Sequence, residues 1–92
     1  MASRIEVEAS NDREFRVRVM DAKSESSHNV TLKPEHYERL TGGKIEPKEL
    51  VRRSFEFLLE REPKESILRQ FDLQVIERYF PEYEREIKRR IT

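Results

Sequence analysis

The feature that most constrains the fold is a change in the spacing of hydrophobic residues near Pro34. Before this proline, apolar and polar residues alternate in short runs, which is the pattern of strands with one buried face. After it, apolar residues recur at intervals of three and four, which is the pattern of amphipathic helices. The sequence therefore predicts an α+β fold with strands first and helices after.

Three predicted strands come first, and the first two form an antiparallel hairpin because a short polar turn separates them. A small, polar and serine-rich stretch before the third strand is predicted to be a mobile connection. The predicted strands cover residues 4–9, 14–19 and 28–33, and the connection covers residues 21–27.

Prolines and glycines mark the ends of the predicted helices. Pro34 suits the first position of a short helix, and Gly42 with Gly43 ends it because glycine tolerates left-handed backbone. Pro47 opens one long amphipathic helix that runs towards Pro63. Short C-terminal helices are then predicted over residues 64–71, residues 73–80 with Asp72 as N-cap, and residues 83–91.

The length of 92 residues indicates a single domain. A chain this short buries only about 60 to 65% of its unfolded surface. Since 35% of the residues are hydrophobic and 41% are charged, we expect a homodimer in which a second protomer helps to complete the core. Within the domain we distinguish a strand-rich part (residues 1–33), a helix-turn-helix part (residues 34–62) and an amphipathic helical tail (residues 63–92).

Charge and cysteine content narrow the functional classes. Nineteen basic residues balance nineteen acidic ones, which argues against nonspecific nucleic-acid binding but leaves room for a site-specific reader. The chain has no cysteine, so we expect the protein to reside in the reducing cytoplasm. No stretch approaches the roughly 20 apolar residues of a membrane span, so we expect no membrane partner.

The sequence contains no recognisable catalytic constellation. His28 and His36 each lack a second histidine three or four positions away, so we expect packing or surface roles rather than a metal site. Gly42-Gly43-Lys44 lacks the remainder of a phosphate-binding loop, and no nucleophile turn of the Gly-x-Ser-x-Gly type is present. We therefore expect a non-enzyme without a metal or cofactor.

The order of elements from His28 to Glu62 resembles the ribbon-helix-helix family of dimeric DNA-binding proteins. It consists of a short strand, a short helix, a glycine-containing turn and a longer helix. The resemblance implies a regulatory binding protein of antitoxin or repressor type, in which strands of two protomers pair across the dimer axis and enter the major groove. The implied DNA-contact residues are Asn29, Thr31 and Lys33 on the strand, with Lys44 and Lys48 near phosphate.

Two alternatives stay open at this point. The third strand also fits a single antiparallel sheet within the monomer, covered by the long helix. In function, the alternative is a protein-interaction module without nucleic-acid binding that uses the apolar stripe of the C-terminal helices, although such a stripe is more often core than interface. The candidate partner-binding residues are Leu73, Ile76, Tyr79, Phe80 and Tyr83.

Overall fold

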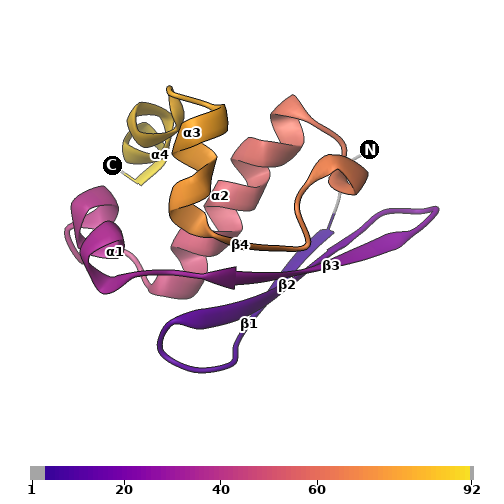
Figure 1. The fold of residues 1–92 in the computed structure, drawn as a ribbon, viewed down its shortest axis with the longest axis horizontal. Coiled ribbons are helices and arrows are strands. Elements are labelled where there is room, and N and C mark those ends of the chain that lie inside the picture. The colour runs from indigo at the N-terminus through magenta and orange to yellow at the C-terminus, as the bar shows by residue number, and fades with distance from the viewer. Residues whose placement is uncertain (1–3, 92) are drawn as a thin grey trace.

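The computed structural model describes residues 4–91, which form a sheet with the helices packed on one of its faces (Figure 1). The strands are β1 (Arg4–Ala9), β2 (Glu14–Met20), β3 (Glu25–Thr31) and β4 (Gln70–Asp72). The α-helices are α1 (Pro34–Thr41), α2 (Pro47–Arg61), α3 (Ile76–Tyr79) and α4 (Tyr83–Ile91). Two short 3-10 helices, η1 (Lys64–Ser66) and η2 (Leu73–Val75), flank β4.

The sheet has the strand order β1-β2-β3-β4. β1, β2 and β3 are antiparallel neighbours, and Val17 lies opposite both Val7 and His28. β4 runs parallel to β3 and pairs Phe71 with Val30. The α+β class and the N-terminal hairpin are thus confirmed. The third strand joins the hairpin in one sheet within the chain, which is one of the two alternatives that the sequence left open. The prediction missed β4, which makes the sheet four-stranded and mixed.

The predicted mobile connection before the third strand is instead a tight turn followed by the start of β3. Asp21 closes this turn, since its carboxylate accepts hydrogen bonds from the backbone N–H groups of Lys23 and Ser24 at 2.8 and 2.9 Å. Glu25 and Ser26 then pair with β2. Pairing along an existing strand outweighs the weak strand preference of serine, which local composition alone cannot show.

The predicted helix over residues 64–71 is also wrong. One 3-10 turn forms, and the chain then extends into β4. A short isolated helix is only marginally stable, whereas β3 offers a row of backbone groups at its edge, where Asn29 donates its N–H to the carbonyl of Arg69 at 2.7 Å. The predicted cap is confirmed, because the Asp72 carboxylate accepts from the N–H of Gln74 at 2.9 Å.

The ends of α1 and the start of α2 lie at the predicted prolines and glycine. α1 starts at Pro34 and stops at Gly42, whose φ of 59° lies in the left-handed region. α2 starts at Pro47 and covers the inner face of the sheet (Figure 1).

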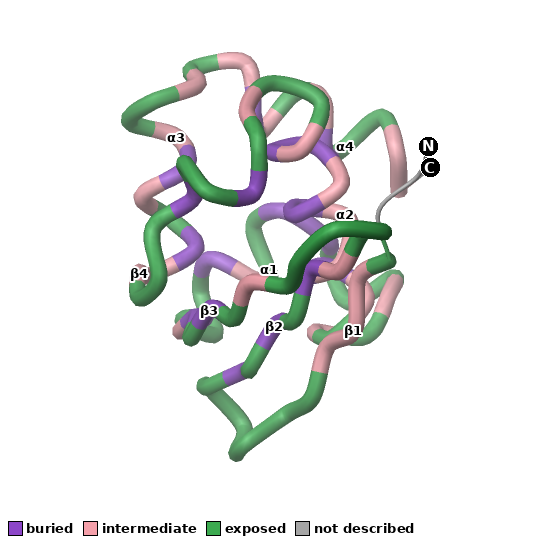
Figure 2. Tube along the Cα trace, turned by 90° about the vertical axis from the view of Figure 1, so that its right-hand side faces the viewer, coloured by how far each residue is buried: buried purple, intermediate pink, exposed green. Residues whose placement is uncertain are grey.

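The core lies between the sheet and the helices, where buried positions gather along the chain (Figure 2). Phe57 on α2 is fully buried and packs in this core. The C-terminal helices contribute a quarter of the buried hydrophobic residues, so the tail is part of this core rather than an appendage. Those residues are Leu73, Ile76, Tyr83 and Ile87.

Candidate functional site

An apolar groove opens between the C-terminal half of α2, the segment that leads into β4, and α3, elements that stand together in Figure 1. Its volume is about 340 Å³, which is near the lower end of the range of about 300 to 1,000 Å³ for ligand pockets. The lining is mostly apolar, and it includes Leu58, Glu62, Leu68, Phe71, Val75 and Tyr79.

Two large hydrophobic side chains at this groove are exposed. Leu68 is 49% exposed and Tyr79 is 67% exposed, and within residues 4–91 no other large hydrophobic side chain is exposed. Both line the same groove. Exposed apolar surface that gathers in one place commonly marks a binding site. The groove is therefore the strongest candidate site of the molecule.

His28 anchors the segment that carries Leu68. The imidazole is buried in β3, where its Nδ1–H donates to the carbonyl of Leu68 at 2.8 Å and its Nε2 accepts from the Ser26 hydroxyl at 2.8 Å. The ring lies 5.3 Å from the ring of Phe55. Burial lowers the pKa of His28, which favours this neutral form. The residue thus has the packing role expected from the sequence, and it fixes one wall of the groove.

Lys64 anchors the same segment from its other end. The side chain is 6% exposed, and its ammonium group donates to Oδ2 of Asp21 at 2.7 Å and to Oε2 of Glu65 at 2.8 Å. The Lys64 hydrogen bond, with two backbone N–H groups, lowers the pKa of Asp21 to about 2. These contacts join η1 to the turn between β2 and β3.

An aromatic cluster holds α3 and α4 against α2. Phe57 meets Phe80 and Tyr83 edge to face, with ring centroids 5.9 and 5.4 Å apart. The Arg61 guanidinium lies 3.7 Å from the centre of the Phe57 ring. On the other side, the Tyr83 hydroxyl is 2.6 Å from Oγ of Ser54. Together these contacts fix the wall of the groove that α3 forms.

One carboxylate at the groove has no ionic partner. Along α2, Glu49, Glu56 and Glu60 each form an ion pair with an arginine. Glu62 follows directly after α2 and lines the groove, and it forms no ion pair within the described part of the chain. The groove therefore combines apolar walls with one negative group available to a ligand.

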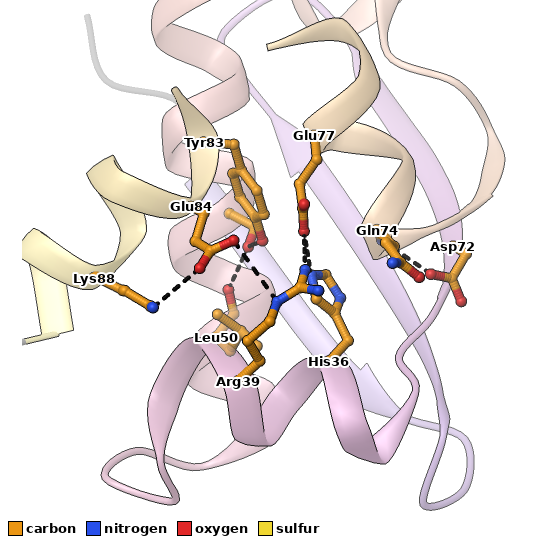
Figure 3. Close-up of polar contacts among 10 residues, drawn as sticks. His36, Arg39, Leu50, Asp72, Gln74, Glu77, Tyr83, Glu84 and Lys88 are labelled. Carbon is orange, nitrogen blue, oxygen red and sulfur yellow. Dashed lines mark hydrogen bonds and ion pairs between the residues drawn. The ribbon is translucent and has the colours of Figure 1, made fainter. Parts of the chain in front are cut away.

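A polar cluster elsewhere joins α1 to α3 and α4 (Figure 3). His36 is 2% exposed, and its Nε2 lies 2.9 Å from Oε2 of Glu77. Arg39 contacts the same carboxylate and lies 3.7 Å from Glu84. Burial lowers the pKa of His36 despite the neighbouring Glu77, so the ring is neutral and donates to that carboxylate. Because a proton-transfer group must reach its substrate and the His36 ring is buried, this cluster is best understood as a joint between helices.

The residues proposed to contact DNA lie on β3, at the starts of α1 and α2, and in the loop between these helices. Asn29 and Thr31 lie on the outer face of β3, and Thr31 donates its hydroxyl proton to Asp72 at 2.8 Å. Lys33, Lys44 and Lys48 are exposed at the starts of α1 and α2 and in the loop between these helices. Over residues 29–31, β3 already pairs with β2 on one side and β4 on the other. Pairing of this segment with a second copy would require β4 to leave.

The five stripe residues divide into two groups. Leu73, Ile76 and Tyr83 are buried in the core of the chain, so the folded surface does not offer them to a partner. Tyr79 is exposed, and Phe80 is half-buried at the groove.

Leu68 and Glu62 are the site residues that the sequence analysis missed. The sequence predicted a helix over residues 64–71, whereas the backbone around Leu68 leads into a strand. The sequence pattern that could have revealed Leu68 is the adjacent apolar pair Ile67-Leu68 within an otherwise polar segment. In extended backbone, neighbouring side chains point to opposite sides, so Ile67 enters the core and Leu68 faces outward.

Comparison with protein-family models, curated proteins and solved structures found no match to this chain. Across residues 4–91, none of the helices has the length and apolar character needed to cross a bilayer.

Proposed function

We propose that this chain is a protein-interaction module that holds an apolar segment of a partner protein in the groove between α2, β4 and α3. The observation that carries the proposal is the position of Leu68 and Tyr79, whose side chains are 49% and 67% exposed and line the same groove. Elsewhere in residues 4–91 the large hydrophobic side chains are covered or half-covered. A partner that covers these two would therefore bury the main apolar patch of the surface.

The shape and chemistry of the groove favour a protein segment over a small molecule. Its polar lining is limited to groups such as Glu62 and Ser66, whereas small-molecule sites usually fix their ligand with several converging polar groups. Tyrosine at the rim is typical of protein interfaces, where an aromatic body and a polar tip suit a partly wet surface. The anchored walls also mean that binding does not have to order the groove first.

A DNA-binding function of repressor type has less to support it. Its candidate residues fall on two separate regions, and the strand that would insert into DNA has partners on both sides. The acidic residues Glu35 and Glu46 lie beside the candidate lysines at the starts of α1 and α2, which weakens a local positive field. We therefore place the interaction function first.

Selection of displayed random peptides on the immobilised chain tests the proposal. We expect enrichment of apolar peptides that bind the Leu68→Ser/Tyr79→Ser variant at least tenfold more weakly, because the rim no longer offers apolar surface. The matched control is Lys33→Ser/Lys44→Ser, which alters two exposed residues away from the groove and should keep full affinity. Circular dichroism establishes that both variants are folded. Equal binding by the two variants, or a selection without apolar enrichment, would contradict the proposal.

A further inference from the structure

The groove lies beside an open edge of the sheet. β4 is the last strand in the order β1-β2-β3-β4, so within residues 4–91 one of its two edges has no neighbouring strand. Figure 2 shows β4 at the margin of the sheet with α3 on the helical side. An open edge presents a row of backbone donors and acceptors that another extended chain can pair with.

The register defines which backbone groups face this edge. Asn29 donates its N–H to the carbonyl of Arg69, so the groups of Arg69 are directed towards β3. The direction of backbone groups alternates along a strand, so Phe71 also faces β3, while Gln70 directs its N–H and C=O groups to the open edge. Asp72 offers its N–H there, because its C=O belongs to the first turn of η2. Phe71, which lines the groove, therefore lies between Gln70, whose N–H and C=O are both directed to the open edge, and Asp72, whose N–H is directed there.

Side-chain alternation connects this edge to the groove. Phe71 points to the helical side of the sheet, where its ring lies 6.0 Å from that of Phe55, and it also lines the groove. An added strand would place every second side chain on the same side, at a spacing of about 6.6 to 6.8 Å. Those side chains would meet the apolar walls that carry Leu68 and Tyr79.

We propose that the partner segment is an extended peptide that adds to β4 as a fifth strand, with apolar side chains at alternate positions in the groove and a basic side chain paired with Glu62. This inference rests on the proposed interaction function and specifies the conformation and charge of the partner. Glu62 supports the basic residue because it is half-buried at the groove and has no cationic partner within residues 4–91. A helical partner would instead present apolar residues three and four positions apart and would not use the backbone of β4.

Backbone methylation of a synthetic peptide separates strand addition from simple apolar contact. The probe is a fluorescein-labelled hexapeptide of sequence KTVTLT, in which Lys, Val and Leu share one side of an extended chain. Two derivatives carry N-methyl groups either on the Lys, Val and Leu amides or on the three Thr amides. We expect one derivative to bind at least tenfold more weakly by fluorescence anisotropy and the other to bind like the parent, because only alternate amides face β4.

The proposed pairing of Glu62 with the lysine of the peptide is tested with the same probe. Glu62→Gln should weaken binding of the parent peptide three- to tenfold and should have no effect on a peptide with norleucine in place of Lys. The control Glu8→Gln removes an exposed carboxylate from β1 and should leave both affinities unchanged. Failure of KTVTLT to bind, equal binding of the two methylated derivatives, or indifference to Glu62→Gln would overturn the inference. If displayed apolar peptides still required Leu68 and Tyr79, the interaction function would stand without strand addition.

Discussion

The buried contact between Tyr83 and Ser54 offers a quantitative test of how α4 is held against α2. Both side chains are fully buried. Ser54 donates its hydroxyl proton to the carbonyl of Leu50 at 2.8 Å, so its one proton is already used. The Tyr83 hydroxyl must therefore be the donor across the 2.6 Å contact between the two hydroxyl groups.

This assignment predicts unequal costs for the two single substitutions. Tyr83→Phe removes the donor and leaves a weakly satisfied acceptor, which should cost about 1 kcal/mol of unfolding free energy. Ser54→Ala leaves the Tyr83 hydroxyl buried without an acceptor and should cost about 2 kcal/mol. The double variant removes both polar groups and should cost about 1 kcal/mol rather than about 3, so we expect a coupling energy of about 2 kcal/mol.

Urea unfolding followed by circular dichroism gives the unfolding free energy of the original protein, the two single variants and the double variant. The comparison requires that the slope of free energy against urea concentration is the same for all four. Burial raises the pKa of Tyr83 well above its usual value, so the coupling should not change between neutral and mildly alkaline pH. Additive costs, with a coupling below about 0.5 kcal/mol, would refute the proposed hydrogen bond. A larger cost for Tyr83→Phe than for Ser54→Ala would refute the assignment of donor and acceptor.

Three further predictions concern pH and the tail. Burial lowers the pKa of His36, so the unfolded chain binds the proton more readily and the protein loses stability as pH falls below about 6.5. His36→Gln should remove this part of the loss. Urea midpoints at pH 7.5 and 5.5 measure the effect, and a variant with the same pH dependence as the original protein would contradict the prediction. The pKa of Asp21 is lowered to about 2 in the folded chain. The stability that this carboxylate supplies is therefore present above about pH 3.9 and is lost as pH falls towards 2. Asp21→Asn should lower the Tm at neutral pH but not near pH 2, and equal Tm differences at both pH values would count against the pairing with Lys64. A chain truncated after Phe71 should lose its cooperative thermal transition by circular dichroism, since the tail supplies core residues, whereas a folded truncated chain would show that the tail is dispensable. The core residues removed are Leu73, Ile76, Tyr83 and Ile87.

The elements that depend on neighbouring residues could be predicted from the sequence. Alternation over residues 4–9 and 14–19 predicted the hairpin, because both strands lie close together along the chain and the apolar face of each packs against the core. Pro34, Gly42 and Pro47 gave the ends of α1 and α2 because each residue suits a particular backbone conformation.

β4 could not be predicted in the same way. Gln70–Asp72 is too short to show a period, and its extended conformation depends on β3, which is distant in sequence. The groove could not be predicted for the same reason, because Leu68 is exposed only when the backbone before β4 is not helical. The apolar stripe of the tail was visible in the sequence, but the separation of buried Ile76 from exposed Tyr79 required the packing of α2 against α3.

The parallel pairing of β3 with β4 also bears on the order in which the molecule assembles. Partners in this pair are 41 positions apart, as in Thr31 and Asp72, whereas the hairpins close over short turns. Longer loops cost more chain entropy to close, so we expect β4 to join the sheet after the hairpins have formed. Since Phe71 helps to line the groove, the groove is complete only after this last step. A partner bound there contacts the groove only when β4 is in place, so its binding would stabilise the pairing of β4 with β3.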